Sequence, residues 1–392
     1  MYKIVQTSGG VCLADGFFAD GVSAGLKKNS AKDMAFIYSD VPCEIASVFT
    51  TNKMTAAPIK HFKAKGDFKT NFIIINAKNA NAITGQAGVD DIDDILVTLP
   101  KEVVNPVMSS TGVIGVRLPK EKIIDGAKLF DLTQKEPLNA AKAIMTTDTF
   151  SKEIALRVEL EDGSSFNIGA MAKGAGMINP AMATMLCFIT TDANVSKQEM
   201  QTVLDEVTLT TFNAASVDGD TSTNDTVMLL SNAKSSAYDA TAFREALHTI
   251  MYFLAREMVR DGEGATKLVT YEVSGAKDDR EAEVVAKALS DSLLVKTALY
   301  GEDPNWGRIA STVGASGVKC FEGTLKVSFE DVCVYDKGKI YFDAQMEEKA
   351  SLVMKRDNFT ISCDLGVGEG TFTSFGCDLG HEYVKINADY RT

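Results

Sequence analysis

One stretch of the sequence places a hydroxyl where a self-cleaving chain would need it. A glycine-rich polar loop ends at Pro180, three small or flexible residues follow, and Thr184 opens the apolar run 185–189, which has the composition of a buried strand. Ala181 and Ala183 leave little bulk near the Thr184 hydroxyl, so its attack on the preceding carbonyl is sterically conceivable. Cleavage of the peptide bond before Thr184 would make that residue a chain N-terminus.

A free N-terminal threonine can act as its own catalyst. Its hydroxyl is a weak nucleophile until a base removes the proton, and the α-amine of the same residue can be that base. An unperturbed α-amine has a pKa of about 7.7 to 8.0, so much of it accepts protons near neutral pH. The stretch on its own favours the ordinary interpretation, in which Thr184 is a β-branched residue that begins a strand.

Two loops after predicted strands also offer polar groups for chemistry. The strand 103–108 leads to Thr111 and Gly112, a pair that can direct a hydroxyl and a backbone N–H at one point, as an oxyanion requires. The strand 72–76 runs into the loop 77–85, which is dense in small and amide residues. Loops of this kind often carry sites, although a simple turn is the more frequent explanation.

Two acidic loops follow later in the chain. Residues 217–226 are rich in carboxylates and hydroxyls but lack the spacing of an EF-hand, which favours a polar surface or a site-lining loop over a metal site. Residues 261–267 expose Glu263 between two glycines and do not have the order of a Walker A loop. Lys173 and Glu263 alone are equally explained as solvated charges.

The surrounding pattern predicts the elements that must hold these residues. Strands 154–160 and 166–171, joined across an Asp-Gly turn, form the clearest hairpin and deliver the chain to Lys173. Ser196 and Glu199 have the spacing of a capping box. Strands are also expected at 34–38, 45–49, 227–230, 268–273 and 382–386, and helices at 90–99, 120–130, 138–146, 196–212, 240–259 and 278–290. From about residue 275 short alternating strands with glycine turns follow the charged helix.

Composition narrows the class of protein. With 392 residues, 45% hydrophobic and 24% charged, the chain is long enough for two globular domains. A net charge of -13 argues against a nucleic-acid or anionic-membrane partner, and the sequence shows neither a signal peptide nor a membrane span. Seven scattered cysteines without a CxxC pair fit a reducing cytoplasm. The three histidines have no ligand or triad spacing, so no metal site is expected.

Several motifs, taken in order, resemble one family. Lys173-Gly-Ala-Gly-Met-Ile-Asn-Pro-Ala-Met-Ala-Thr184-Met is similar to the processing-site motif of the ornithine acetyltransferase (glutamate N-acetyltransferase) family of arginine biosynthesis. One departure is the pair Ala77-Lys78, where the family's Ser-Gly is expected before Asn79, and it bears on the conformation of that loop. The other matching stretches are 48–52, 79–85, 110–115, 261–267, 301–308 and 390–392.

The resemblance implies a mechanism. The chain would cut itself between Ala183 and Thr184 into an α chain, 1–183, and a β chain, 184–392. Thr184 would take the acetyl group of N-acetylornithine as an ester, release ornithine and pass the acetyl group to glutamate in a ping-pong reaction.

The resemblance also implies the roles of other residues. Thr111, through its hydroxyl, and Gly112, through its N–H, would form the oxyanion hole. Lys173 would face a substrate carboxylate and Glu263 a substrate amine. The remaining substrate-binding residues implied in this way are Thr147, Asn387 and Thr392.

The expected fold class is α/β (α+β). The resemblance implies a layered sheet sandwich flanked by helices, similar to that of N-terminal-nucleophile enzymes, with a smaller C-terminal α/β domain. The sequence places the boundary so that the two domains are 1–274 and 275–392. The resemblance further implies a heterotetramer of two α and two β chains. No cofactor is expected, with acetyl-CoA as an optional co-substrate that some family members accept.

Three alternatives stay open at this point. The chain could be a self-processing N-terminal-threonine amidase or aminopeptidase that gives its acyl group to water. It could be a non-catalytic ligand-binding relative, which predicts no chain cleavage and no acetyl-enzyme. It could also be a pathway paralogue with a different acceptor.

Overall fold

The computed structural model describes residues 1–179 and 185–389 of the chain. The described residues form two compact units. Unit 1 comprises 1–174, 185–212 and 221–255, and unit 2 comprises 175–179, 213–220 and 256–389. The domain boundary that the sequence places near residue 275 stays a prediction.

Unit 1 is built on a sheet that is nine-stranded within the described residues and has the order β1-β6-β7-β8-β9-β3-β4-β5, with β2 paired to β3. The pairs β8–β9 and β4–β5 are parallel, and the others are antiparallel. The strands are β1 (Tyr2–Thr7), β2 (Phe17–Val22), β3 (Met34–Phe49), β4 (Thr70–Asn76), β5 (Val107–Ser110), β6 (Lys152–Leu160), β7 (Ser165–Lys173), β8 (Leu186–Thr191) and β9 (Thr226–Ser231).

One long strand, β3, divides this sheet into two layers. Its first part pairs with β2 and β4 and its last part with β9, and the register shifts between Tyr38 and Cys43. A single apolar cluster then combines Ile37, Ile73 and Ile75 from one part with Phe188 and Leu230 from the other. The two parts of the sheet therefore face each other across a shared core, as in a sandwich.

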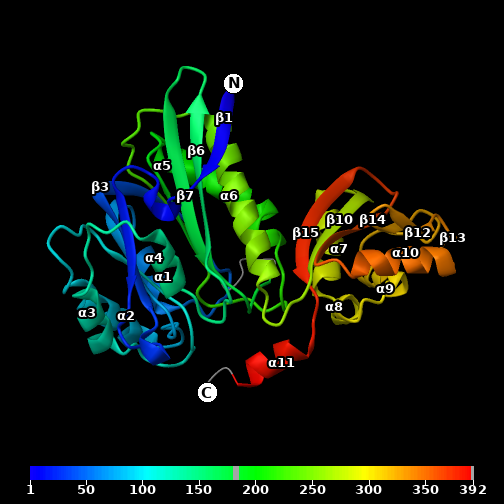
Figure 1. The fold of residues 1–392 in the computed structure, drawn as a ribbon, viewed down its shortest axis with the longest axis horizontal. Coiled ribbons are helices and arrows are strands. Elements are labelled where there is room, and N and C mark those ends of the chain that lie inside the picture. Colours follow the sequence, from blue (N-terminus) through cyan, green and yellow to red (C-terminus); the bar gives the residue numbers. More distant parts are fainter. Residues whose placement is uncertain (180–184, 390–392) are drawn as a thin grey trace. The chain divides into compact units, whose positions relative to one another are not determined.

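Helices cover the outer faces of both layers. On one side, Ile92 of α2 and Ile123 of α3 pack with Phe36 of β3. On the other, α6 runs alongside β7 (Figure 1), and Phe243 of α6 meets Phe166 of β7 with ring centroids 6.1 Å apart. The helices are α1 (Ala57–Ala64), α2 (Gly85–Leu96), α3 (Lys120–Ala127), α4 (Pro137–Ala143), α5 (Lys197–Thr210) and α6 (Ala240–Arg260), the last continuing past Ala255, with short 3-10 turns at Gly10–Cys12, Lys28–Ser30 and Phe212–Ala214.

Unit 2 contains a second sheet, six-stranded within the described residues, in the order β13-β12-β11-β14-β10-β15. Its strands are β10 (Leu268–Ala276), β11 (Lys326–Phe329), β12 (Val332–Asp336), β13 (Lys339–Ile340), β14 (Asn358–Asp364) and β15 (Gly370–Cys377). Its helices are α7 (Asp279–Asp291), α8 (Leu293–Tyr300), α9 (Trp306–Ala315), α10 (Ala344–Met354) and α11 (His381–Ala388).

The core of unit 2 follows from helical spacing. Asp278 caps α7 by accepting the N–H of Glu281 at 3.0 Å. Ala282, Val285, Ala286 and Leu289 then recur every three or four residues, so they share one face, and all are buried against the sheet. The result is a helix held by its N-cap and by one apolar stripe.

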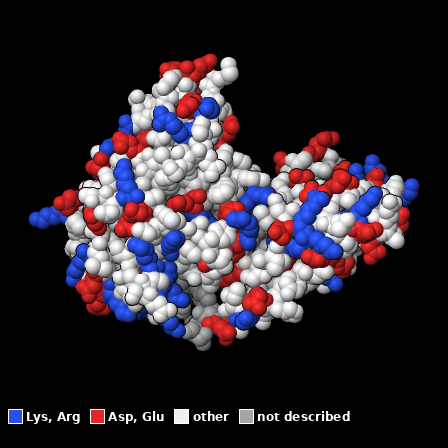
Figure 2. All heavy atoms as spheres, viewed as in Figure 1, with Lys and Arg blue, Asp and Glu red and all other residues white. Residues whose placement is uncertain are grey.

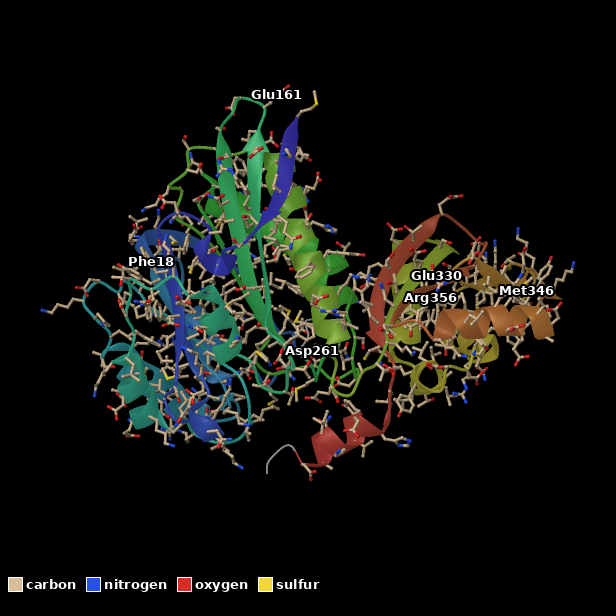
Figure 3. All side chains as sticks on the ribbon, in the orientation of Figure 1. Phe18, Glu161, Asp261, Glu330, Met346 and Arg356 are labelled. Atoms are coloured by element: carbon tan, nitrogen blue, oxygen red, sulfur yellow. The ribbon has the colours of Figure 1, made fainter. Side chains whose placement is uncertain are left out.

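The α/β class and the helix-flanked sheet sandwich are confirmed. The 154–171 hairpin is present as β6 and β7, with Glu159 opposite Ser165 and Glu161 at its tip (Figure 3). The Ser196 side chain accepts from Glu199 N at 3.3 Å, as the capping pattern predicts. Acidic and basic side chains are interspersed over the face drawn in Figure 2. Among the described residues, no helix combines the length and apolar character that crossing a bilayer needs.

Three predictions of elements are wrong. The strands expected at 34–38 and 45–49 are one strand, β3, which continues through the irregular stretch that contains Pro42. The strand expected at 382–386 is part of helix α11. The C-terminal region is not a run of strands alone, because α8 and α9 precede β11, and α10 separates β13 from β14.

Candidate active site

Thr111 lies at the end of a fully buried strand. Ser110, the last residue of β5, pairs with Asn76 of β4, and its hydroxyl donates to Asn76 Oδ1 at 2.6 Å. The N–H of Thr111 donates to the Asn76 carbonyl at 3.0 Å. Thr111 is 2% exposed. Its position is therefore fixed by the sheet and by a buried side-chain contact.

Gly112 occupies a site that only glycine fits. Its φ is 134°, in the region that side-chain-bearing residues rarely adopt, and an added Cβ would lie 2.2 Å from the carbonyl carbon of Lys78. The next residue, Val113, donates its N–H to the Lys78 carbonyl at 3.2 Å. The Thr111-Gly112 pair thus lies directly on the loop that follows β4.

That loop has an unusual backbone. Lys78, Asn81 and Ile83 all have positive φ, at 70°, 47° and 57°. Non-glycine residues in this region cost on the order of 1 to 3 kcal/mol each and cluster at functional sites. Lys78 is the position where the family's glycine is expected, so the backbone keeps a glycine-like conformation without the glycine.

Lys173 brings a buried cation to the same place. It ends β7, is 2% exposed, and its Nζ donates to Thr111 Oγ1 at 3.3 Å. A buried ammonium requires partners that offset its desolvation. A hydroxyl, a glycine N–H segment and a cation gathered at the ends of two strands can stabilise negative charge on a ligand.

Asp148 is the anion that accompanies this cation. Its Oδ1 accepts from Lys152 Nζ at 2.8 Å and from the N–H of Gly174 at 2.7 Å, and its Oδ2 accepts from the N–H of Thr146 at 3.0 Å. Burial acts to raise the pKa of Asp148, but Lys173, Lys152 and these hydrogen bonds outweigh it and hold the pKa at about 2. Asp148 therefore stays ionised and fixes the backbone just after Lys173.

Thr147 lies in the turn that Asp148 organises. It is half-buried, and both of its neighbours in the chain take part in the Asp148 hydrogen bonds. The structure thus places Thr147 in the segment that supports Lys173.

The end of the acidic loop is also buried. Ser222, Thr223, Asn224 and Asp225 are all at most 5% exposed. This part of the loop is therefore not the polar surface loop that the sequence also allowed, and the site-lining interpretation stays a prediction.

Unit 2 brings Glu263 and Asn387 together. Asn387 Nδ2 donates to Glu263 Oε2 at 2.8 Å, and the N–H of Glu263 donates to the Ala175 carbonyl at 2.7 Å. A Cβ on Gly176 would lie 2.5 Å from the Glu263 carboxyl carbon, so the glycine lets the carboxylate approach the chain. Glu263 follows Asp261, which is labelled at the end of α6 in Figure 3.

Two carboxylates organise the loops of this second region. Asp378 Oδ1 accepts the N–H groups of Thr266 and Lys267, at 2.7 and 2.9 Å. Asp218 accepts the N–H groups of Met177 and Ile178, at 2.6 and 2.9 Å, and the hydroxyl of Tyr383 at 3.1 Å. Burial raises the pKa of Asp218.

The predicted site residues thus fall into two groups. Unit 1 brings together Thr111, Gly112 and Lys173, with Thr147 on the supporting turn, and unit 2 brings together Glu263 and Asn387. The remaining predicted site residues, Ala183, Thr184 and Thr392, lie outside the described residues.

Sequence reasoning missed the residues that hold these groups in place. They are acidic, amide or basic residues, all but Lys152 in loops, and most of them hold backbone groups 26 or more residues away in the sequence. Only their clustering near the recognised motifs could have indicated them. They are Asp148, Lys152, Asp218, Asn224, Asp225 and Asp378. No group of three His, Cys, Asp or Glu side chains suited to a metal occurs in the part of the chain that the structure describes.

Comparison with known proteins gives consistent matches. The ArgJ family model matches residues 18–392. An arginine biosynthesis bifunctional protein ArgJ from Wolinella succinogenes is 59% identical over 396 residues, covering all of both chains. Two solved structures are also similar: ArgJ from Bacillus halodurans (40% identity, TM-score 0.47, 51% of this chain and 96% of that one) and ornithine acetyltransferase from Mycobacterium tuberculosis (31%, 0.38, 47% and 100%).

Proposed function

Because the chain belongs to the ArgJ family, we propose that it transfers an acetyl group from N-acetylornithine to glutamate. Family membership makes it an acetyltransferase of arginine biosynthesis. The observation that carries the specific proposal is the buried contact between Lys173 Nζ and Thr111 Oγ1 beside Gly112. Acyl transfer to and from amino acids needs hydrogen-bond donors that stabilise the oxyanion and a cation that binds the substrate carboxylate.

The nucleophile in this proposal is Thr184, freed as an N-terminus by self-cleavage after Ala183. Its hydroxyl oxygen bonds to the acetyl carbon while its α-amine takes the hydroxyl proton. The bond between the acetyl carbon and the ornithine nitrogen then breaks, and the α-amine passes the proton to that leaving nitrogen. In the second half of the reaction the glutamate amine attacks the ester and takes the acetyl group, and the proton that the glutamate amine gives up returns to the threonine oxygen.

Other residues have supporting roles. Thr111, by its hydroxyl, and Gly112, by its N–H, stabilise the oxyanion of each tetrahedral intermediate. Lys173 binds a substrate carboxylate and Glu263 a substrate amine, in keeping with their charges. The remaining substrate contacts are assigned to Thr147, Asn387 and Thr392.

The names of similar proteins support a second activity. The Wolinella protein is called bifunctional, which favours synthesis of N-acetylglutamate from acetyl-CoA as the further reaction of this chain. In this proposal acetyl-CoA is a substrate and no bound cofactor is needed. We further propose a heterotetramer of two α chains (1–183) and two β chains (184–392), located in the cytoplasm.

Self-cleavage is tested by denaturing electrophoresis and N-terminal sequencing of the wild type beside Thr184→Ala. The proposal expects two wild-type fragments, the second beginning Thr-Met-Leu-Cys, and one intact variant chain. A single intact wild-type chain after native expression contradicts the self-cleaved nucleophile and favours the non-catalytic alternative.

A second assay separates a transferase from a hydrolase. The enzyme is given N-acetylornithine with and without glutamate, and N-acetylglutamate and free acetate are measured. The transferase makes N-acetylglutamate and little acetate. Acetate release that glutamate does not suppress would favour the amidase alternative.

A further inference from the structure

Two consecutive residues, Asn224 and Asp225, connect both sides of the proposed reaction centre. They immediately precede β9, lie within unit 1, and are 5% and 0% exposed. None of the roles proposed above uses them. The Asn224 side chain contacts a residue more than a hundred positions earlier in the chain, and the Asp225 side chain contacts a residue 40 positions earlier.

Asn224 holds the segment before the oxyanion hole. Its Nδ2 donates to the Ser110 carbonyl at 2.8 Å and to the Ala80 carbonyl at 2.6 Å. Its Oδ1 accepts the Thr223 hydroxyl at 2.7 Å. The amide therefore uses both of its N–H groups on carbonyls, one of them in the residue directly before Thr111, and a carboxylate or hydroxyl could not supply two such donors.

Asp225 holds the other segment. Its Oδ1 accepts the N–H of Met185 at 3.2 Å, and the N–H of the next residue, Thr226, donates to the Met185 carbonyl at 3.1 Å. Met185 is thus bound at both its N–H and its carbonyl. It directly follows the proposed nucleophile, Thr184, in the chain.

The second oxygen of Asp225 sets its chemistry apart from a surface carboxylate. Oδ2 is buried and has no hydrogen-bond partner among the described residues. Burial raises the pKa of this carboxyl well above its ordinary value, although the nearby Lys173 lowers it. An asparagine at this position keeps Oδ1 as an acceptor for the Met185 N–H.

We propose that Asn224 and Asp225 form a clamp of positioning residues that fixes the Ser110–Thr111 segment relative to the segment beginning at Met185. This deepens the proposed function and rests on it, because the clamp would set the separation of oxyanion hole and nucleophile. A displacement of about 1 Å between reacting groups can lower the rate on the order of a hundredfold.

The clamp predicts a specific order of variants. Asn224→Ala and Asp225→Ala each slow self-cleavage and lower kcat for acetyl transfer on the order of a hundredfold, with KM little changed, because substrate contacts are untouched. Asp225→Asn retains the Met185 contact and stays close to wild type. Asn224→Asp keeps the volume of the side chain but loses the donors, and it behaves like Asn224→Ala.

Asn71 provides a matched control. It is also a buried asparagine of unit 1, donating to the Glu102 carbonyl at 2.9 Å and accepting the N–H of Val104 at 2.7 Å, at the opposite end of β4 from Asn76. Asn71→Ala removes a comparable pair of hydrogen bonds and lowers Tm. It leaves self-cleavage and kcat of the folded protein close to wild type.

The deciding experiment adds hydrogen–deuterium exchange, which needs no activity. The clamp predicts that Asn224→Ala or Asp225→Ala speeds exchange in peptides covering both 108–113 and 185–190, and that Asn71→Ala speeds neither. The clamp is overturned if exchange speeds up only in the mutated loop. It is also overturned if Asn224→Ala and Asp225→Ala cleave themselves and transfer acetyl groups as well as Asn71→Ala does. If wild type neither cleaves nor transfers, the proposed function fails, while the exchange result still decides the clamp.

Discussion

In unit 1 the site residues continue buried strands, whereas in unit 2 they lie on a loop and on a helix that stays open to solvent. Thr111 and Lys173 are each 2% exposed and follow or end strands of the sheet. Asn387 belongs to α11, and none of the residues of this helix, His381–Ala388, is buried. Side chains on strands are held by the whole sheet, while Asn387 is held by a few polar contacts.

This difference separates two tasks. In the proposed function, chemistry at a carbonyl needs donors placed in advance, and the buried region of unit 1 would supply them. In the proposed function Glu263 binds a substrate amine, and its contact with Asn387 on an exposed helix tolerates more adjustment. We therefore expect changes at the site residues of unit 1 (Thr111, Gly112 and Lys173) to lower kcat, and changes at Glu263 and Asn387 of unit 2 mainly to raise KM.

The largest effect is expected at Gly112. Gly112→Ala would place a Cβ 2.2 Å from the Lys78 carbonyl carbon at a φ of 134°, so the oxyanion segment must move. Loss of one oxyanion donor costs on the order of a hundredfold or more in kcat. Gly115→Ala is the control, because its φ is also positive, at 81°, but nothing lies within 4 Å of the added Cβ. Equal kcat in the two variants would contradict this placement.

Asp148→Asn should destabilise the fold strongly. Asp148 and Lys152 form an ion pair with both side chains 0% exposed, and breaking such a pair costs about 3 to 5 kcal/mol. The control is Asp125→Asn, whose partner Lys128 is 67% exposed, for which about 1 kcal/mol or less is expected. Urea unfolding measures both. Similar losses in the two variants would show that the buried pair has no special weight.

The same residue gives stability a pH dependence. The pKa of Asp148 is depressed to about 2 in the folded chain, from 3.8 in the reference state, so its stabilisation is fully present above pH 4 or so. It is lost as pH falls from the unfolded pKa through the folded one. The difference in free energy of unfolding between wild type and Asp148→Asn should therefore shrink below about pH 4, and a constant difference would argue against an ionised Asp148.

Asn387→Ala tests the more open region. It removes the hydrogen bond that holds Glu263 Oε2, so in the proposed function the carboxylate is less well oriented toward the substrate amine and KM should rise about tenfold. Because α11 buries no residue, the loss of this bond should lower Tm only slightly. Lys385→Ala on the same helix is the control, because the Lys385 side chain pairs with the exposed Glu382. A fall in kcat with unchanged KM would place Asn387 in the chemical step instead.

The smallest effect is expected at Lys78. Its φ of 70° is a conformation that glycine adopts without strain. The relief of about 1 to 2 kcal/mol is partly offset by the greater freedom of glycine in the unfolded chain, so Lys78→Gly should stabilise by up to about 1 kcal/mol. Thermal unfolding measures the change. Destabilisation would show that the Lys78 side chain contributes more than its backbone strain costs.

Local pattern was sufficient where one face of an element is buried. The apolar stripe of α6 was predictable because burial of one face imposes the helical period, and the β6–β7 hairpin was predictable because two apolar runs flank an Asp-Gly turn. Helix α11 was not, because a helix without buried residues has no such stripe. The strand β3 was split in the prediction because Pro42 indicates a turn, whereas the sheet absorbs it as a shift of register.

The candidate site was predictable only as far as motifs reach. Thr111, Gly112 and Lys173 were identified by resemblance, and the structure brings them together. Asp148 and Asp225 were not, because an acidic residue in a polar loop has the same local pattern whether it is solvated or buried against a distant backbone N–H. Only the three-dimensional fold shows which of the two it is.

The most direct test of the proposed mechanism is to look for the acetyl group on Thr184. Purified enzyme is mixed with N-acetylornithine in the absence of glutamate, quenched with acid, digested and analysed by mass spectrometry. The mechanism predicts one acetyl group on the peptide that begins at Thr184, which disappears when glutamate is added before quenching. Ornithine release with no acetyl group on that peptide, or an acetyl group that glutamate does not remove, would contradict it.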